Sequence, residues 1–488
     1  MTSPATKSNL TLQDLLIVED DAAIPNFRCA ATGLPIWPHV RIMFLRLLMS
    51  DLLYGTSFTT TTRALSRRMP ATMARSIVRN ASFRLTRRCR AEVCLFSVGV
   101  ANQWIDGKWL NRLTDHFALS GPERTLTIEE SFEWRWQFPR HNERVMFHAP
   151  FQAYAAVAGR VLVRERHRRQ AEQLITLVSE RSKRYLNWRP GPQREQHLIE
   201  VLSRKIAVAA RQYRAYQSLL AQVQPKLLMI GAACYGPAAT LICAARNMNI
   251  TTAEYQHGAI SAGHDAYNFA PAVRDSQAYR ETLPDHFLSY GSWWNEQINA
   301  PVSKTVIGNP HREARLQPGS GTRAKEHILI LSDGIEFGLY LDLARRLEPI
   351  AKARGLKVVI RPHPYERSTV QARYGQQVEG VSIDQNVDIY ESLRCAHAVI
   401  SEVSTGLFDA VDLADRLFIF DTPKARFGYP TYPFPSFTAA QELAEMLLAD
   451  EVGRMSRQAV EAIWAPQWHS HYAQFLRAQG VGTTGRST

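Results

Sequence analysis

The sequence predicts an α/β fold in which two doubly wound domains face a cleft, with an extended, helical and basic N-terminal region. Three observations predict this fold. Short apolar runs alternate with helix-length segments in the C-terminal half, the same alternation begins near residue 226, and polar clusters follow directly after the apolar runs. Strands separated by helices indicate βαβ units, and therefore parallel sheets.

The apolar runs and the chain breakers between them predict the order of the elements. We expect an acceptor-side domain over residues 1–310, a donor-binding domain over 323–475 and a flexible tail over 476–488, with a Pro/Gly cluster at 316–322 between the domains. Strands are predicted at 91–98, 226–230, 251–255, 287–290, 304–307, 327–331, 356–360, 398–400 and 417–420. Helices are predicted at 160–186, 195–220, 238–248, 337–354 and 387–395, and from Ser404 onward.

Charge and motif content exclude several classes of function. The chain has 488 residues and a net charge of +13, which favours phosphate-bearing partners. It has no G-x-x-x-x-G-K-[ST] loop and no strand-linked G-x-G-x-x-G, so neither a P-loop NTPase nor a dinucleotide oxidoreductase is supported. No Asp-x-Asp is arranged as a metal site, so we expect no metal and no cofactor. The six cysteines form no C-x-x-C pair, as in a cytoplasmic protein with reduced thiols.

The first polar cluster, Gln256-His257-Gly258, follows the predicted strand that contains Glu254. In an open α/β sheet, ligands bind outside the carboxyl ends of the strands, so we expect all four residues at the cleft on the acceptor side. His257 is a candidate general base; the alternative is a core or turn histidine. Asn309, in Gly308-Asn309-Pro310, lies at the predicted domain junction, where a hinge and a substrate contact are equally consistent with the sequence.

The second cluster, Arg361-Pro362-His363-Pro364, also follows a predicted strand. An arginine at a strand end can bind phosphate bidentately, and the prolines restrict the backbone on both sides of His363. We therefore expect Arg361 and His363 to hold a donor phosphate, with His363 also a candidate acid, and we place Glu366 in the same group. The alternative is a turn in which His363 caps a backbone group.

Two further strand ends carry polar residues. Ser404 and Thr405 begin a predicted helix, where free N–H groups and hydroxyls attract phosphate; the alternative is plain N-capping. Asp333-Gly334 follows the strand at 327–331, and a glycine there permits close approach of a ligand. Asp333 is a second candidate base or a ribose ligand, and Gly334 is placed in the phosphate-binding group.

Basic segments predict contact with an anionic membrane surface. Residues 63–90 contain nine arginines and no acid, and Met73, Ile77, Ala81 and Leu85 form an apolar stripe among them. A second basic cluster lies at 160–169, and residues 36–53 are apolar but too often interrupted by charges to span a bilayer. We expect a cytoplasmic protein, peripheral on the inner membrane. Nucleic acid is not an expected partner, because no base-stacking motif accompanies the charge.

The motifs in this order, over residues 225–420, resemble those of bacterial capsule and surface-polysaccharide glycosyltransferases of the GT-B type, which have two Rossmann-like domains. They are also similar to those of teichoic-acid-type glycerophosphotransferases and bacterial sialyltransferases. The resemblance implies that His363, Ser404 and Thr405 bind the phosphate of a donor. The sialyltransferase pattern often has a second acidic residue directly before the aspartate, whereas Ser332 stands before Asp333 in this sequence.

The sequence therefore predicts a glycosyltransferase that uses a CMP-, CDP- or UDP-linked sugar. Its acceptor would be a polysaccharide or a lipid-linked glycan of the bacterial surface. The alternatives are a CDP-glycerol-type glycerophosphotransferase, a nucleotide-sugar epimerase, and a catalytically inactive protein that binds polysaccharide or nucleotide.

Overall fold

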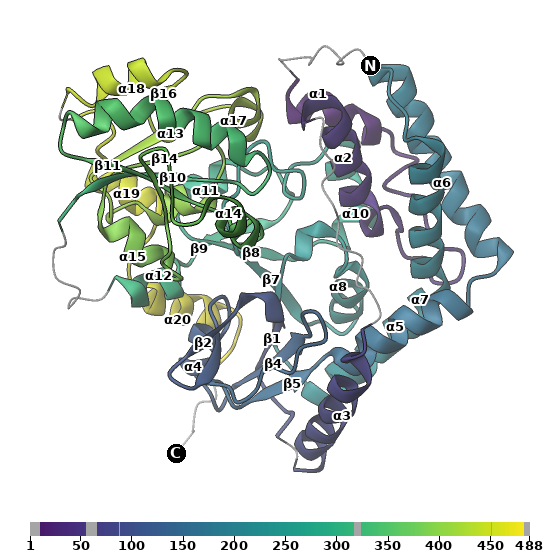
Figure 1. Cartoon of the computed structure of the whole chain (residues 1–488). Coiled ribbons are helices and arrows are strands. Elements are labelled where there is room, and N and C mark those ends of the chain that lie inside the picture. The colour runs from purple at the N-terminus through teal and green to yellow at the C-terminus, as the bar shows by residue number, and fades with distance from the viewer. Residues whose placement is uncertain (1–9, 55–65, 87, 317–323, 450, 483–488) are drawn as a thin grey trace.

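The fold is described from a computed structural model, which describes residues 10–54, 66–86, 88–316, 324–449 and 451–482. Two seven-stranded sheets, each covered by helices, form two α/β domains (Figure 1). The predicted fold class is confirmed. The separating Pro/Gly cluster lies almost entirely in residues 317–323, outside the described residues.

The N-terminal sheet is parallel throughout, in the order β5-β4-β1-β6-β7-β8-β9. Its central strands are nearly continuous apolar runs, because helices cover both faces of a parallel sheet. The short or polar strands β4 and β5 were not predicted, since they lack such a run. The strands are β1 (Val93–Val98), β4 (Thr125–Glu130), β5 (Val145–Phe147), β6 (Leu227–Gly231), β7 (Thr251–Tyr255), β8 (His286–Ser289) and β9 (Ser303–Val306).

The C-terminal sheet has the order β12-β13-β11-β10-β14-β15-β16, and the β12–β13 pair is antiparallel. All its other neighbours are parallel. The strands are β10 (His327–Leu331), β11 (Lys357–Arg361), β12 (Gln377–Val378), β13 (Val381–Ile383), β14 (Ala396–Ser401), β15 (Arg416–Phe420) and β16 (Ser436–Phe437). A separate hairpin, β2 (Asn102–Ile105) with β3 (Lys108–Asn111), belongs to the N-terminal domain.

Helices cover the sheets and build the N-terminal region. The predicted helix at 160–186 begins only at Glu165, since Arg164 has an extended backbone and residues 160–161 are the end of the preceding helix. In the N-terminal half the helices are α1 (Leu12–Leu16), α2 (Arg41–Met49), α3 (Met69–Leu85), α4 (Asp115–Leu119), α5 (Ala149–Val161), α6 (Glu165–Leu186), α7 (Pro192–Val223), α8 (Ala239–Arg246), α9 (Pro271–Asp275), α10 (Gln277–Arg280), α11 (Ser292–Glu296) and α12 (Pro310–Arg315). The others are α13 (Phe337–Lys352), α14 (Arg367–Tyr374), α15 (Ile389–Arg394), α16 (Thr405–Asp409), α17 (Pro423–Gly428), α18 (Ala440–Met446), α19 (Arg457–Ile463) and α20 (Trp468–Ala478).

The apolar segment at 36–53 is part of the core, so it does not provide a membrane-facing surface. Trp37, Phe44 and Leu48 are all fully buried. Arg41, which interrupts the apolar run, is also buried and pairs with the buried Glu19 at 2.7 Å. A charge inside an apolar segment is tolerated here because its partner is buried with it. None of the helices in the described part of the chain is both long and apolar enough to cross a membrane.

The predicted end of the C-terminal domain, residue 475, is wrong, because α20 packs on the other domain. Trp468, Tyr472 and Phe475 join the core formed by β1, β6 and β7. The prediction of a flexible tail from residue 476 is also wrong at its start, since α20 runs to Ala478 and Val481 is 2% exposed. Residues 483–488 lie outside the described residues. The last helix therefore ties the C-terminal segment to the N-terminal sheet.

Candidate active site

A cleft of about 1160 Å³ lies between the two domains at the carboxyl ends of their strands. His257 and Gly258 line it from the N-terminal domain; His363, Ser404 and Thr405 line it from the C-terminal domain. The arrangement is that of the GT-B type, with two Rossmann-like domains facing a cleft. Motifs separated by more than a hundred residues in the sequence thus meet at one site.

His257 is the titratable group that the N-terminal domain presents to the cleft from the end of β7. Its Nδ1 lies 3.4 Å from the hydroxyl of Tyr267 and 4.0 Å from the carboxylate of Glu254. Burial lowers the pKa of His257 to about 4, and the nearby charges of His264 and Arg112 act in the same direction. The imidazole is therefore neutral at pH 7, which is the form that accepts a proton.

Glu254 does not line the cleft but lies beneath His257. It is fully buried and accepts hydrogen bonds from the hydroxyl of Tyr267 at 2.5 Å and from the backbone N–H of Cys234 at 2.8 Å. Burial raises the pKa of Glu254 to about 7, although those hydrogen bonds oppose the shift. Glu254 is thus placed to position His257 rather than to contact an acceptor directly.

A second histidine of the same wall, His264, was not predicted. Its Nε2 lies 3.0 Å from the hydroxyl of Tyr235, and its Nδ1 lies 3.3 Å from Asp265. Asp265 also pairs with Arg46 at 3.1 Å. The sequence signal was weak, because His264 follows no strand and its partner Tyr235 lies 29 residues away in the chain.

Ser404 and Thr405 lie on the opposite wall, at the start of α16. Ser404 caps this helix, since its Oγ accepts a hydrogen bond from the N–H of Gly406 at 3.2 Å. Thr405 Oγ1 accepts one from the N–H of Ala259, in the other domain, at 3.3 Å. A hydroxyl that accepts a bond still has its own hydrogen to donate. The helix has five residues, so the two hydroxyls are the donors that the geometry offers here.

His363 faces the cleft from the turn after β11, and burial lowers its pKa. Its ring packs on Gly334, which has a φ of +82°; a Cβ at Gly334 would lie 3.0 Å from the ring. Gly334 therefore makes room for His363 and does not itself line the cleft. The Nδ1 of His363 accepts a hydrogen bond from the N–H of Tyr365 at 3.3 Å, so Nε2 is left for a ligand.

Glu366, which was predicted to bind phosphate, does not line the cleft. Its carboxylate accepts hydrogen bonds from the N–H of His363, at 2.9 Å, and from the hydroxyl of Ser332. A carboxylate would repel a phosphate, whereas here it holds the turn that carries His363. Glu366 is a structural support of the donor wall.

Arg361 lines the cleft, but its guanidinium is already occupied. One terminal nitrogen contacts the carboxylate of Asp384 and the carbonyl oxygen of Asn386, at 2.9 Å for the latter. The other donates to the carbonyl oxygen of Val387 at 3.0 Å. The side chain is 10% exposed. The prediction that Arg361 grips phosphate bidentately is corrected, since these partners hold the loop at residues 384–388 instead.

Asp333 also lines the cleft, but it is paired with a cation. Lys424 lies 2.5 Å from Asp333 and 2.7 Å from the buried Glu402. Burial opposes the charge on Lys424, but the two carboxylates raise its pKa above the usual value. An aspartate that is held by a lysine is a poor base, so the geometry favours His257 over Asp333 for that role.

Gln256 and Asn309 lie behind the cleft, contrary to the prediction. The side chain of Gln256 donates to the carbonyl of Gly258 at 2.8 Å and accepts from the N–H of Tyr290 at 2.9 Å, which holds the turn at His257. Asn309 caps α12, since its side chain accepts from the N–H of Arg312 at 3.1 Å. Both residues shape the backbone around the site.

The β2–β3 hairpin brings unpredicted residues into the cleft. Trp104, which is 55% exposed, and Arg112, which follows β3 and is exposed, both line it. Sequence reasoning missed them because the hairpin is an insertion after β1 and carries no strand-end motif.

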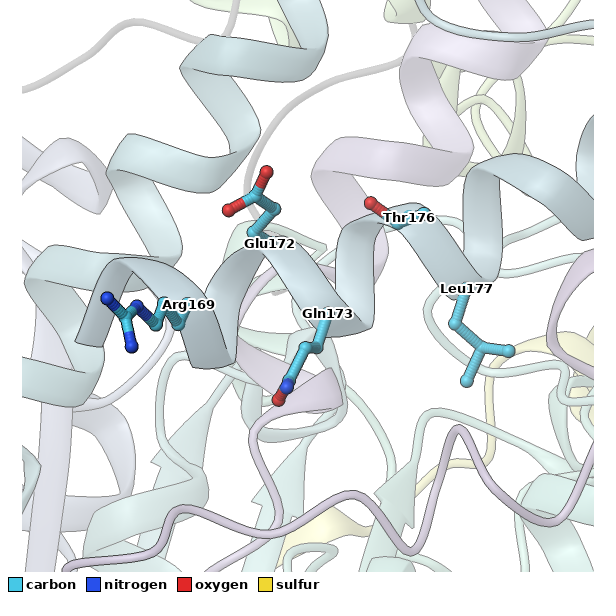
Figure 2. Close-up of a pocket in the computed structure, with 5 residues that line it drawn as sticks. All are labelled: Arg169, Glu172, Gln173, Thr176 and Leu177. Atoms are coloured by element: carbon cyan, nitrogen blue, oxygen red, sulfur yellow. The ribbon is translucent and has the colours of Figure 1, made fainter. Parts of the chain in front are cut away.

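A second, shallow pocket is less suited to chemistry. Its lining residues, labelled in Figure 2, all belong to α6: Arg169, Glu172, Gln173, Thr176 and Leu177. One helix face without converging groups from other elements does not form a site. Among the described residues, no cluster of three or more His, Cys, Asp and Glu side chains has the arrangement of a metal site.

Comparisons with known proteins found no matching family model and no matching curated protein. Among solved structures, the chain is similar to UDP-GlcNAc 2-epimerase from Neisseria meningitidis bound to UDP-GlcNAc, at 11% identity over 79% of this chain and 99% of the other, with a TM-score of 0.42. It is also similar to a variant of the wall teichoic acid polymerase TagF, at 10% identity over 86% and 98%, with a TM-score of 0.41. At these scores neither likeness carries an argument about this chain. The fold assignment rests on the sheets described above.

Proposed function

We propose that this protein is a glycosyltransferase that moves a sugar from a nucleotide-activated donor to a hydroxyl of a bacterial surface polysaccharide. One observation carries the proposal: the neutral His257 faces the same cleft as His363, Ser404 and Thr405. A proton acceptor on one domain and donors for phosphate oxygens on the other are what transfer from a phosphate leaving group requires.

In this reaction, His257 takes the proton of the acceptor hydroxyl. Because Nδ1 faces Tyr267 and Glu254, Nε2 is the nitrogen available for it. The acceptor oxygen attacks the donor carbon, and the bond from that carbon to the phosphate oxygen breaks. The nucleotide leaves with the bonding electrons, and Glu254 stabilises the imidazolium that forms.

The nucleotide is received on the C-terminal wall. The hydroxyls of Ser404 and Thr405 and Nε2 of His363 donate hydrogen bonds to phosphate oxygens, which stabilises the charge that develops as the bond breaks. The acceptor binds against the N-terminal wall, where Trp104 offers an exposed apolar face. Both walls together exclude water, because hydrolysis of the donor is the competing reaction.

The test combines binding and turnover. Purified protein is screened by thermal shift against CMP, CDP, UDP, GDP and ADP, since a ligand that binds only the folded state raises the melting temperature. We expect at least one nucleotide to do so and His363→Ala to abolish the effect. The corresponding nucleotide sugars are then assayed for release of the nucleotide with lipid-linked glycan acceptors.

The products discriminate the alternatives. A glycerophosphotransferase would release CMP from CDP-glycerol and leave a phosphodiester in the product. An epimerase would convert UDP-GlcNAc without any acceptor. A protein that binds a nucleotide but turns over none of the donors would contradict transfer.

We further propose that α3 and α5 bind an anionic membrane surface, which would bring the enzyme to a lipid-linked acceptor. The buried face of α3 carries Thr72, Ser76 and Phe83, whereas Ile77, Val78 and Leu85 are 50%, 72% and 85% exposed. The helix also packs Phe83, Met69 and Met73 inward, so it has apolar side chains on both its buried and its exposed side, whereas an ordinary surface helix has them on the core side.

The neighbouring helix extends the same surface. On α5, which packs beside α3 (Figure 1), Val157 and Val161 are 47% and 75% exposed. Arginines flank these side chains, among them Arg75 and Arg84, and such a mixture of apolar and basic groups suits anionic lipid. Arg79 is not part of it, because it donates to the carbonyls of Val145 and Glu143 and so holds α3 on the sheet.

A further inference from the structure

Among the described residues, the C-terminal wall of the cleft has hydroxyls for a phosphate but no unpaired positive charge. Burial lowers the pKa of His363, so its imidazole is neutral at pH 7. Arg361 is held by Asp384, and Lys424 is held by Asp333 and Glu402. A nucleotide phosphate brings at least one negative charge into this cleft. The balancing cation must therefore come from elsewhere.

The N-terminal wall has such a cation in Arg112. Among the described residues that line the cleft, every other arginine or lysine is in an ion pair, whereas Arg112 has neither an ion-pair nor a side-chain hydrogen-bond partner. The pairs are Arg46–Asp265, Arg315–Asp388, Arg361–Asp384 and Lys424 with Asp333 and Glu402.

We infer that Arg112 binds the phosphate of the donor from the domain opposite Ser404 and Thr405. This inference rests on the proposed function for the identity of the ligand, but the anion-binding role of Arg112 stands on the cleft geometry alone. The guanidinium presents a planar fork of donors that matches two phosphate oxygens. Donor binding then requires both domains at once.

The charge of Arg112 acts in the middle of the cleft. It contributes to the lowered pKa of His257, and it opposes the effect of burial on the pKa of Asp409 on the facing wall. His257 is two residues from Ala259, whose N–H contacts Thr405. Arg112, the candidate base and the phosphate-binding hydroxyls are therefore neighbours.

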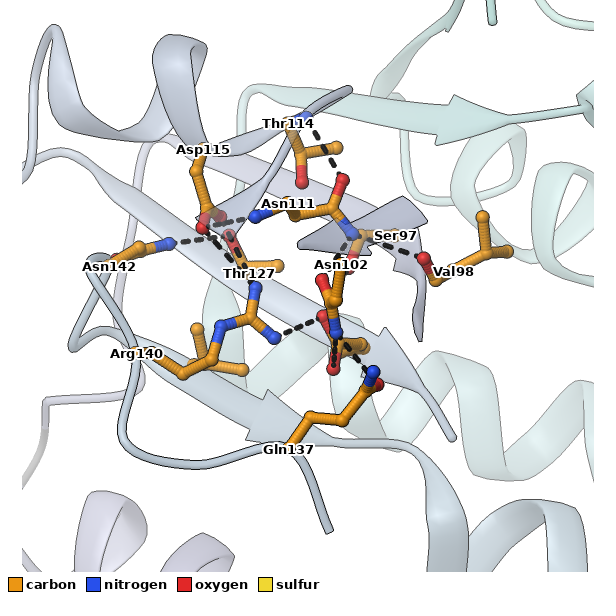
Figure 3. Close-up of polar contacts among 12 residues, drawn as sticks. Ser97, Val98, Asn102, Asn111, Thr114, Asp115, Thr127, Gln137, Arg140 and Asn142 are labelled. Atoms are coloured by element: carbon orange, nitrogen blue, oxygen red, sulfur yellow. Dashed lines mark hydrogen bonds and ion pairs between the residues drawn. The ribbon is translucent and has the colours of Figure 1, made fainter. Parts of the chain in front are cut away.

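A buried polar network holds the segment that carries Arg112. The side chain of Asn111 donates to the carbonyl of Val98 at 3.0 Å and to Asn102 at 2.9 Å, and its own N–H donates to Asp115 at 2.8 Å. Arg140, with a fully buried side chain, joins this cluster to the sheet by pairing with Asp115 at 3.3 Å and with Glu129 (Figure 3).

This network fixes the base of the hairpin on both strands. Asn102 at the start of β2 and Asn111 at the end of β3 are hydrogen-bonded to each other and to the sheet. The backbone from which Arg112 projects is therefore held rigidly. The hydrogen bonds and ion pairs among these buried groups offset much of the cost of burying them, and such a network favours one arrangement. An arginine that binds a ligand is expected to project an exposed guanidinium from a rigidly held backbone, as Arg112 does here.

The test uses full-length protein and inorganic pyrophosphate, which does not depend on knowing the nucleoside. We expect pyrophosphate to raise the melting temperature of the wild type, less so at high ionic strength. Arg112→Gln should weaken this binding tenfold or more, and Arg112→Lys should weaken it less. Arg169→Gln, which removes a charge from α6 at a residue that does not line the cleft (Figure 2), is the matched control and should change nothing.

A second readout separates binding from a structural role. Removing the charge of Arg112 should raise the pKa of His257, followed by NMR of the imidazole, while the circular dichroism spectrum stays unchanged. A wild type that pyrophosphate does not stabilise, or an Arg112→Gln variant that binds it normally, overturns the inference.

Turnover with donor and acceptor distinguishes this inference from the proposed function. If Arg112→Gln raises the KM for the donor, the phosphate that Arg112 binds is that of the donor, as inferred. A higher KM for the acceptor alone would assign it to a phosphorylated glycan and overturn the donor assignment. Pyrophosphate binding that depends on Arg112, in a protein that transfers nothing, would contradict the proposed function but not the anion site.

Discussion

The backbone N–H of Ala259 donates a hydrogen bond across the cleft to Oγ1 of Thr405, at 3.3 Å. The bond joins the turn after β7 to the start of α16, and it brings the two most informative motifs of the sequence into contact. It also orients Thr405, because a hydroxyl that accepts from the protein has its hydrogen directed elsewhere.

Thr405→Val should weaken nucleotide binding while preserving the shape of the side chain. We expect a loss of about 0.5–1.5 kcal/mol for one hydrogen bond, seen as a smaller thermal shift with the nucleotide that stabilises the wild type. Thr405→Ser, which keeps the hydroxyl, should bind like the wild type. Equal binding by the valine variant would remove Thr405 from the donor site.

His257→Asn should reduce transfer by about 10²- to 10⁴-fold, the usual contribution of a general base, without reducing nucleotide binding. In the wild type, the acid limb of the profile of kcat/KM against pH should lie near pH 4, because burial lowers the pKa of His257 to about 4. A limb near pH 6.5 would show that the base is a different group. Asp333→Asn is the matched variant and should lose far less activity.

Glu254→Gln should remove a pH dependence of stability. The pKa of Glu254 is raised to about 7 from 4.5, so its protonated form favours the fold; this stabilisation is complete below pH 4.5 and is lost as pH rises through 7. The shift corresponds to at most about 3 kcal/mol. We expect urea unfolding to show equal stability of variant and wild type near pH 5 and a more stable variant at pH 8. Parallel pH curves for the two proteins would contradict the assignment.

Gly334→Ala should destabilise the protein and displace His363. The residue has a φ of +82°, and the added Cβ would meet the imidazole at 3.0 Å, so we expect about 1–3 kcal/mol lower unfolding free energy and loss of the nucleotide thermal shift. Gly338→Ala is the control, since a Cβ there has no neighbour within 4 Å and lies near the start of α13. Similar effects in both variants would argue against a special role for Gly334.

Ile77→Glu combined with Val78→Glu should release the protein from phosphatidylserine vesicles in a sedimentation assay, with the fold unchanged, because both side chains are largely exposed. Leu448→Glu, at a residue 74% exposed on the other domain, should leave binding intact. Vesicle binding that is unaffected by the double substitution would contradict the membrane surface on α3.

Local sequence motifs predicted many of the residues at the site, but they did not predict which charged side chains are already paired with one another. Arg361 and Asp333 were expected to face a ligand because each follows a strand. In the structure, Arg361 is instead paired with Asp384, 23 residues away in the sequence, and Asp333 with Lys424, 91 residues away. The hairpin that carries Trp104 and Arg112 left no recognisable pattern, since its two strands are four residues each and half exposed.

The sequence by itself determined the α/β class, the positions of the central strands and the convergence of His257, His363, Ser404 and Thr405. It could do so because apolar strand runs are local signals and because parallel strands bring their carboxyl ends to one edge of a sheet. Only the tertiary structure decided which charges remain unpaired, that α20 returns to the N-terminal sheet, and that Ile77 and Leu85 of the apolar stripe on α3 face outward. These features depend on contacts between residues far apart in the chain, which no local pattern encodes.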